Sequence, residues 1–212
     1  AWWWDVGDKQ ERLCIGSGRR RRRAGNEWWP RRVRLREQKE IEKILFRLSR
    51  EITESQHDNP LLIGIPRRGD LIAKRISDNL KNFNFSHDLD TVDYIPFRDD
   101  IIEDIEKTLL KINPRDRNVI LIDDVIYTGR TLRASIEAVM HSGRPKLISL
   151  LCLVDRGHRE LPISPKFIGK NIPTNESDYV SVFLEEIDNI DKRMSSIENM
   201  LNQLVDREQP YK

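Results

Sequence analysis

The stretch VILIDDVIYTGRT, residues 119–131, places two adjacent aspartates directly after a run of apolar residues that favour β-strands. A buried strand excludes charge, so Asp123 and Asp124 are predicted to lie at the exposed carboxyl end of a strand. Four small or polar residues follow, where we expect a helix to begin: Thr128, Gly129, Arg130 and Thr131. Free backbone amides, two hydroxyls and the positive end of the helix dipole would converge there, so the stretch predicts a phosphate site.

The sequence on either side repeats this strand, loop and helix pattern. Short apolar runs at residues 61–65 and 147–154 predict two more buried strands. Apolar residues at helical spacing predict helices near residues 41–52, 71–80 and 132–140. Continuous apolar strands that alternate with amphipathic helices indicate an α/β fold, with a mainly parallel, twisted sheet covered by helices on both faces. Ligands bind such sheets at the carboxyl ends of the strands.

The loop after the acidic pair differs from the common nucleotide motifs. No Gly-Lys-Ser/Thr follows, which argues against a Walker loop, and a single glycine stands where a dinucleotide fingerprint needs three. Two carboxylates beside a phosphate site suit a ribose 5-phosphate, because the acids can accept hydrogen bonds from the ribose hydroxyls. The alternative is that Asp123 and Asp124 merely end a strand.

Two long motifs resemble a known family. VILIDDVIYTGRT is similar to the phosphoribosyl pyrophosphate (PRPP) signature of type I phosphoribosyltransferases, and LVDRGHRELPISPKFIGKNIPT, residues 153–174, resembles the bifunctional pyrimidine operon regulator and uracil phosphoribosyltransferase family. With GIPRRG (residues 64–69) and FRDD (residues 97–100), the resemblance covers about residues 40–191. It implies the type I phosphoribosyltransferase fold with a small hood, for which residues 99–112 are the candidate.

The resemblance also implies a reaction, in which uracil displaces pyrophosphate from PRPP to give UMP. It assigns the catalytic residues as Asp123, Asp124 and Arg68, the 5-phosphate site as Thr128, Gly129, Arg130 and Thr131, and the pyrophosphate site as Arg67, Arg68 and Gly69. Mg²⁺ is expected to bind with PRPP near the acidic pair, with no direct protein cage. For Arg67 and Arg68 the alternative is a solvated basic turn.

The base and RNA sites follow from the same resemblance. It places uracil at Asp155, Arg156, Phe167 and Ile168, although Phe167 could instead be an ordinary core residue. It places pyrimidine-operon messenger RNA on a basic face whose candidates here are Arg47, Arg50, His158, Arg159 and Lys170. Phe46 and Arg50 stand where the family has Thr and His in the first helix, Arg67 where it has Thr, and Ser164 where it has Arg. Short hydrogen-bonding side chains that read RNA loops are thereby lost, so we expect specific RNA binding to be weakened.

The charge is divided unevenly along the chain. Residues 1–36 carry eleven Lys and Arg against four Asp and Glu, and hold all five tryptophans, whereas residues 37–212 carry 26 against 31. We expect residues 1–36 to be a disordered basic tail, either a solvated appendage or a nucleic-acid arm. We expect a phosphoribosyltransferase domain at residues 37–191 and an added amphipathic helix at residues 192–212, where packing or self-association is the expected role.

The composition indicates the cellular compartment, and together with the motifs it limits the functions that we expect. No apolar run approaches the length of a membrane span, and the two cysteines suit a reduced compartment, so we expect a cytoplasmic protein. We expect a homo-oligomeric uracil phosphoribosyltransferase whose partners are PRPP, uracil, UMP and, in the family's regulatory role, operon mRNA. Two alternatives stay open: a phosphoribosyltransferase for another base, and an RNA-binding regulator with vestigial catalysis.

Overall fold

A computed structural model describes residues 32–35, 37–55, 58–99, 110–184 and 186–188. The chain divides into two units, residues 1–182 and residues 183–212, and the site lies in the first. None of the helices within the described ranges is long and apolar enough to cross a membrane. The predicted C-terminal helix at residues 192–212 falls outside the described residues, as do residues 1–31 of the predicted tail and most of the hood candidate.

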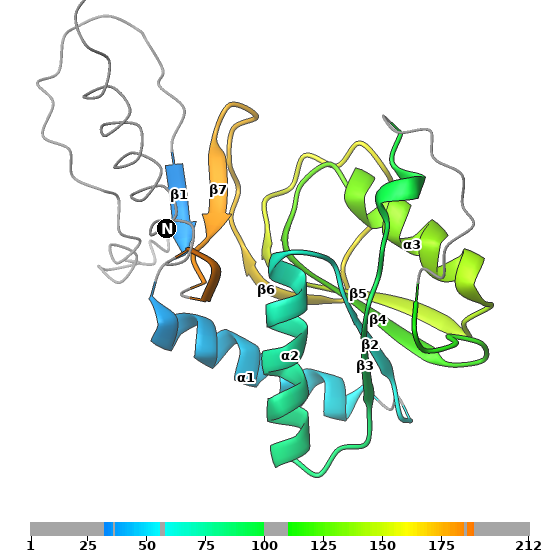
Figure 1. Cartoon of the computed structure of the whole chain (residues 1–212). Helices are drawn as coiled ribbons and strands as arrows, with labels where there is room; N and C mark the ends of the chain where they lie inside the picture. Colours follow the sequence, from blue (N-terminus) through cyan, green and yellow to red (C-terminus); the bar gives the residue numbers. More distant parts are fainter. Residues whose placement is uncertain (1–31, 36, 56–57, 100–109, 185, 189–212) are drawn as a thin grey trace, which may run out of the picture. The chain divides into compact units, whose positions relative to one another are not determined.

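The centre of the first unit is a five-stranded parallel sheet (Figure 1). Its strand order is β3-β2-β4-β5-β6, and every neighbouring pair runs parallel. The strands are β2 (Leu61–Gly64), β3 (Asp88–Thr91), β4 (Asn118–Ile126), β5 (Leu147–Asp155) and β6 (Phe167–Asn171). The predicted α/β fold with a parallel sheet is therefore confirmed, and β3 and β6 are strands that the apolar pattern did not indicate.

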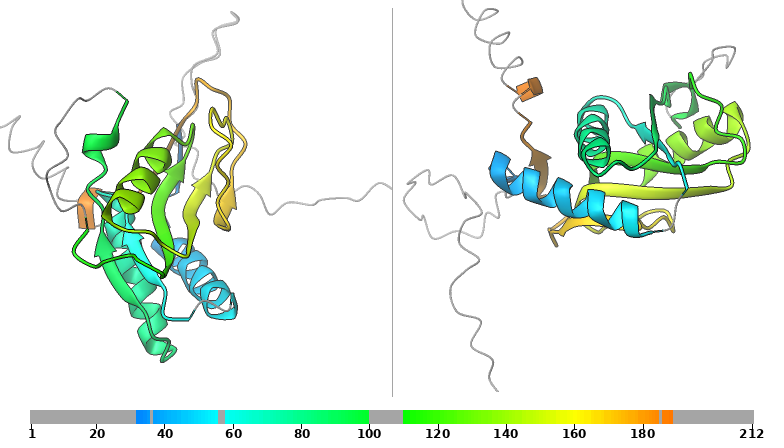
Figure 2. Two further views of the ribbon diagram at one scale, coloured as in Figure 1. Left: turned by 90° about the vertical axis from the view of Figure 1, so that its right-hand side faces the viewer. Right: turned by 90° about the horizontal axis from the view of Figure 1, so that it is seen from below.

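Three helices cover the two faces of this sheet (Figure 2). They are α1 (Gln38–Glu54), α2 (Arg68–Asn82) and α3 (Arg130–Ser142), close to the three predicted ranges. The apolar side of α3 packs with Ile63 and Leu121, and Ile168 of β6 packs against the same cluster. A Cβ on the next residue, Gly169, would meet Ile44 of α1 at 2.7 Å. Because successive strand residues face opposite sides, α1 covers the other face, where it also contacts α2.

A second, two-stranded sheet pairs β1 (Arg32–Leu35) in parallel with β7 (Tyr179–Val182). Leu35 is 2% exposed. This strand lies within residues 1–36, the range that we expected to be a disordered tail. The alternating sequence RVRL has the period of a strand, but the high arginine content of residues 1–36 led us to predict disorder for the whole segment. For residues 1–31 the tail remains a prediction.

Candidate active site

The acidic pair lies within β4, which continues two residues beyond it to Ile126. The Asp124 N–H donates to Asp123 Oδ1 at 2.9 Å, and the Val125 N–H donates to Asp124 Oδ1 at 2.8 Å. Each carboxylate is thus fixed by the backbone amide of the residue that follows it. Both side chains are partly buried, so they are held in defined directions at the edge of the sheet where ligands of parallel sheets bind.

The two carboxyl groups differ electrostatically. Burial raises the pKa of Asp123 well above its ordinary value, and the negative charge of Asp124 raises it further. Burial also raises the pKa of Asp124, but the Val125 amide and the positive charge of Arg68 oppose that rise. Asp124 is therefore the member of the pair that keeps its negative charge more readily, and Asp123 is the member that takes up a proton more readily.

This difference predicts a stabilising substitution. Because the folded-state pKa of Asp123 lies above its ordinary value of 3.8, its contribution to stability is complete below that pH and is lost as pH rises through the folded pKa. Asn keeps the acceptor for the Asp124 amide and adds a donor without charge. We expect Asp123→Asn to raise Tm by a few degrees at neutral pH and to leave it unchanged near pH 3.8. Thermal unfolding across this pH range tests it, and a lower Tm at neutral pH would contradict it.

The loop between β2 and α2 brings Arg67 to the acidic pair, and Arg68 reaches it from the first position of α2. The peptide bond between Pro66 and Arg67 is cis. The start of α2 lies against β4 so closely that a Cβ on Gly69 would be 2.4 Å from the Ile122 carbonyl oxygen. Glycine is required there because any side chain would push the loop away from the sheet.

The acidic pair and the two arginines share one cavity of about 440 Å³. The cavity is lined by Pro66, Arg67, Arg68, Asp93, Tyr94, Ile95, Arg98, Asp123 and Asp124. The structure thus brings together the residues predicted for catalysis and for pyrophosphate binding. It adds a wall from the segment after β3, which no motif had assigned to these roles.

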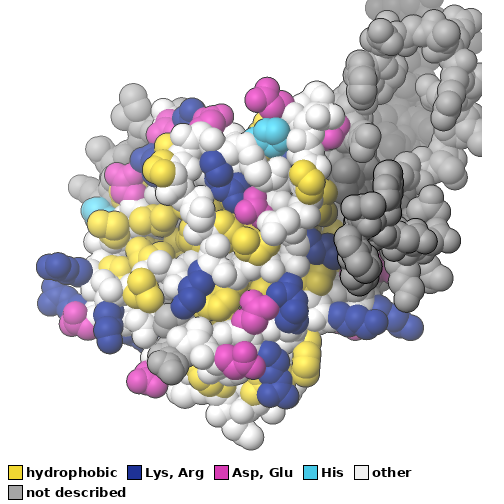
Figure 3. All heavy atoms as spheres, turned by 180° about the vertical axis from the view of Figure 1, so that it is seen from behind, with side chains coloured by type: hydrophobic (Ala, Val, Ile, Leu, Met, Phe, Trp, Pro, Cys, Tyr) yellow, Lys and Arg dark blue, Asp and Glu magenta, His cyan; other side chains and the backbone are white. Residues whose placement is uncertain are grey.

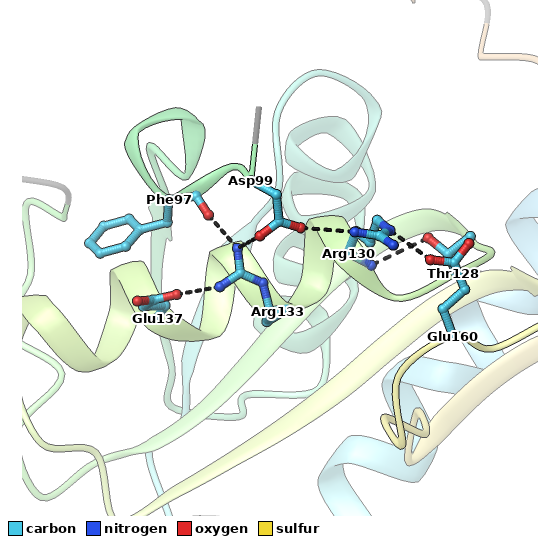
Figure 4. Close-up of polar contacts among 7 residues, drawn as sticks. All are labelled: Phe97, Asp99, Thr128, Arg130, Arg133, Glu137 and Glu160. Atoms are coloured by element: carbon cyan, nitrogen blue, oxygen red, sulfur yellow. Dashed lines mark hydrogen bonds and ion pairs between the residues drawn. The ribbon is translucent and has the colours of Figure 1, made fainter. Parts of the chain in front are cut away.

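The predicted phosphate loop joins β4 to α3. Gly129 has a φ of +92°, a left-handed conformation that favours glycine, and the Arg130 N–H donates to Thr128 Oγ1 at 3.4 Å. The guanidinium of Arg130 contacts carboxylates of Glu160 at 2.6 Å and Asp99 at 3.1 Å (Figure 4). Its charge is therefore offset by protein acids.

A second cavity of about 250 Å³ opens beside this loop. It is lined by Tyr94, Arg98, Asp99, Arg130 and Thr131. Two of these residues, Tyr94 and Arg98, also line the cavity of the acidic pair. The two cavities consequently share one wall, formed by Tyr94 and Arg98.

The residues predicted to bind the base lie around the end of β5 and along β6. Arg156 is 8% exposed, donates to the Asp178 carbonyl at 2.7 Å and lies 3.9 Å from the ring centre of Tyr127. Asp155 and Arg156 line a separate cavity of about 480 Å³, together with Gly157, His158, Asn171, Pro173 and Thr174. Phe167 is 3% exposed at the start of β6. The structure therefore separates Phe167, a core side chain, from the cavity beside Asp155.

The five residues predicted to face RNA make contacts within the chain. Arg159 donates to the carbonyls of Ile163 at 3.0 Å and Tyr127 at 2.8 Å, and pairs with Asp155 at 2.7 Å. Arg47 donates to the Ile168 and Gly169 carbonyls at 2.9 and 2.7 Å.

The other three are similarly engaged. Lys170 pairs with Glu40, the His158 ring contacts the Thr174 carbonyl, and Arg50 lies 4.3 Å from the ring centre of Phe83. On the face shown in Figure 3, Lys and Arg side chains are interspersed with Asp and Glu, and a band of hydrophobic side chains crosses it.

Sequence reasoning gave no site role to Asp93, Tyr94, Arg98 or Glu160. Asp99 entered as the first residue of the hood candidate and as part of the FRDD motif. Arg98 and Asp99, two charged residues of this motif, were the signal in the sequence that could have indicated a site here. Nothing local in the sequence indicates that Asp99 pairs with residues of α3, because the partners are more than thirty residues apart.

A parallel sheet that carries an acidic pair, a phosphate loop and an arginine loop at one edge is the arrangement of a phosphoribosyltransferase, and a model of the phosphoribosyl transferase domain matches residues 33–198. The bifunctional protein PyrR of Clostridium kluyveri is 46% identical over 159 residues, covering 72% of this chain and 90% of the relative. PyrR of Fusobacterium nucleatum is 46% identical over 156 residues, covering 70% and 88%. The chain belongs to the PyrR family of type I phosphoribosyltransferases.

Solved structures share the fold at lower identity. A hypoxanthine phosphoribosyltransferase of Staphylococcus aureus has a TM-score of 0.51 at 24% identity, covering 65% of this chain and 76% of that chain. A hypoxanthine-guanine phosphoribosyltransferase of Bacillus anthracis has a TM-score of 0.53 at 17% identity, covering 65% and 79%. These likenesses support the type I phosphoribosyltransferase fold.

Proposed function

We propose that this protein transfers the phosphoribosyl group of PRPP to uracil, forming UMP and pyrophosphate. The observation that carries the proposal is the shared cavity in which Asp123 and Asp124 meet Arg67 and Arg68 beside the N-terminus of α3. A ribose that carries phosphate groups at two ends needs hydrogen-bond acceptors for its hydroxyls, flanked by two anion sites. This edge of the sheet offers that combination.

Each group has a distinct task in the transfer. The transition state develops positive charge on the sugar and negative charge on the leaving pyrophosphate, so the protein mainly positions and neutralises. Asp124 holds a ribose hydroxyl as a charged acceptor, and Asp123 accepts or donates beside it. Arg68 and Arg67 offset the charge on the pyrophosphate, while the amides of the Gly129 loop bind the 5-phosphate.

Mg²⁺ is the metal that type I phosphoribosyltransferases use with PRPP, and the residues here fit a metal that arrives with its substrate. The described ranges contain no group of three or more His, Cys, Asp or Glu side chains that could hold a metal ion. The carboxylates of Asp123 and Asp124 supply the oxygen ligands that Mg²⁺ accepts, directly or through water. The bound ion would neutralise phosphate charge on the leaving group.

The acceptor base is proposed as uracil because residues 153–174 carry the motif that resembles the uracil-specific family. The cavity beside Asp155 and Arg156 lies at the carboxyl end of β5, on the edge of the sheet that carries the acidic pair. A transferase for hypoxanthine or orotate is the alternative within the same fold.

The test is UMP formation from purified protein, PRPP, Mg²⁺ and uracil, run in parallel with hypoxanthine and orotate. We expect turnover with uracil and none above background with the other two bases. Turnover with hypoxanthine but not with uracil would show that the acceptor base is hypoxanthine, and the proposed phosphoribosyl transfer would still hold. No nucleotide product with any base would refute the enzyme function.

A regulatory role through messenger RNA is the second candidate, because the relatives are named bifunctional. The contacts of Arg47, Arg159 and Lys170 with the protein itself argue that this face reads RNA weakly here. The domain from residue 37 onward also has an excess of acidic residues, which opposes long-range attraction of a polyanion.

We therefore expect equal, salt-sensitive affinity for a pyrimidine-operon leader RNA and for a scrambled control. The measurement is a titration at two salt concentrations with UMP present, on the full chain and on a chain that lacks residues 1–31. If removal of residues 1–31 abolishes the RNA affinity, that affinity is assigned to the arginine run at residues 19–23. Tight binding of the leader alone, strengthened by UMP and independent of residues 1–31, would contradict the expectation.

A further inference from the structure

Arg98 occupies the wall that the two active-site cavities share. It lines the cavity of the acidic pair, where Arg67 and Arg68 lie, and it also lines the cavity beside the phosphate loop, with Arg130 and Thr131. Tyr94 is the other residue found in both linings. Arg98 is exposed, and it is the cation common to both cavities. A guanidinium there can reach anions bound on either side.

The residues on both sides of Arg98 are tied to α3 (Figure 4). Arg133 donates to the Phe97 carbonyl at 2.6 Å and contacts the Asp99 carboxylate at 2.6 Å. Arg130 contacts the same carboxylate at 3.1 Å. The Arg98 N–H itself donates to the Ile95 carbonyl at 3.1 Å. The backbone of Arg98 is therefore fixed relative to the helix whose N-terminus forms the phosphate loop.

The carboxylates around the phosphate loop oppose phosphate binding, so a further cation beside the loop would favour it. Arg130 is the loop's own arginine, but Glu160 and Asp99 offset its charge. Two carboxylates so close to a phosphate would weaken its binding unless another positive group faces the cavity. Arg98 brings a second guanidinium to the lining of the same cavity.

We propose that Arg98 binds PRPP directly and bridges its two anionic ends, the 5-phosphate and the pyrophosphate, with Asp99 as the residue that positions it. This inference rests on the proposed phosphoribosyl transfer. Arginine suits the task because its planar guanidinium presents several donors in a fixed geometry and stays charged. Asp99 acts through its ion pairs with Arg130 and Arg133, without contacting the substrate.

Binding of three probes tests the bridge by calorimetry: PRPP with Mg²⁺, ribose 5-phosphate, and pyrophosphate with Mg²⁺. We expect Arg98→Gln to weaken all three, with PRPP losing roughly tenfold, the size of one charge-assisted hydrogen bond. Arg98→Lys should recover part of the loss, and Tm should not change. Arg115→Gln, an exposed arginine in the loop before β4, is the matched control and should bind as the unmodified protein does.

The outcomes separate this inference from the function on which it rests. Undiminished PRPP binding by Arg98→Gln would overturn it, and so would a loss confined to ribose 5-phosphate or to pyrophosphate. An unmodified protein that neither binds PRPP nor forms UMP would instead refute the proposed function. For Asp99→Asn we expect a smaller net loss of PRPP affinity, because the loss of positioning is opposed by the release of Arg130 from one carboxylate. In the Arg98→Gln background this loss should disappear or become a gain, because positioning has no effect once its target is removed. A full additional loss in the double variant would exclude the positioning role.

Discussion

Replacing Asp124 by Asn is expected to lower kcat/KM for PRPP by roughly a hundredfold while leaving the fold intact. The change removes a charge-assisted hydrogen bond to the ribose, for which we expect a loss of about 2–3 kcal/mol of transition-state stabilisation. Asp124 is the member of the pair that keeps its charge more readily, because Arg68 and the Val125 amide oppose the rise in its pKa. Asn retains the acceptor for that amide, so Tm should change little.

Steady-state kinetics at neutral pH, with PRPP as the varied substrate, measure this effect. Asp116→Asn is the matched control, because Asp116 is exposed and its φ of +57° suits Asn equally well. Asp123→Asn should cost less activity than Asp124→Asn, since Asn resembles the protonated form, which Asp123 takes up more readily than Asp124 does. Unaltered kcat/KM in Asp124→Asn, or a larger loss in Asp123→Asn, would show that the roles within the pair are assigned wrongly.

Replacing Gly69 by Ala is expected to reduce stability and activity together. The added methyl group would lie 2.4 Å from the Ile122 carbonyl oxygen, so either α2 or β4 must move. Overpacking against backbone atoms costs about 3 kcal/mol, which corresponds to a fall in Tm of roughly 6–12 °C for a chain of this size. The movement would also displace Arg68 from Asp124.

Gly157→Ala separates this steric effect from ordinary strain at a glycine. Gly157 has a φ of +75°, but nothing lies within 4 Å of the position of an added Cβ. Its cost should be about 1–2 kcal/mol, the penalty of a left-handed conformation alone. Thermal unfolding of both variants gives the comparison. A Gly69→Ala protein as stable as Gly157→Ala would mean that α2 and β4 can separate without loss.

The sequence was sufficient to predict the central part of the fold and the chemistry at its edge. Residues 61–65, 119–122 and 147–154 are apolar enough to identify buried parallel strands without any tertiary information. The acidic pair lies near the end of one of these strands and the phosphate loop follows it, so their spacing was sufficient to place them together. These are local signals, and the structure preserves them.

The remainder depends on contacts between distant residues. Arg159 carries a charge that suggests a solvent-facing role, yet it donates to two backbone carbonyls and pairs with Asp155. Phe167 could be assigned to stacking or to the core, and only its position on β6 shows that it is buried. The contribution of residues 94–99 to the cavity walls arises from ion pairs to α3 that no periodicity encodes.

The pairing of β1 with β7 has a consequence for synthesis on the ribosome. Arg32 pairs with Tyr179 and Leu35 with Val182, so the first of the described strands to be made needs a partner that is among the last residues of its unit. During translation, residues 32–35 must remain unpaired until residues 179–182 have emerged, while the βα units between them can already pack. Closing so long a segment is slow compared with local helix formation. A nascent chain stalled before residue 179 would therefore expose an unpaired strand, a form that quality-control chaperones can recognise.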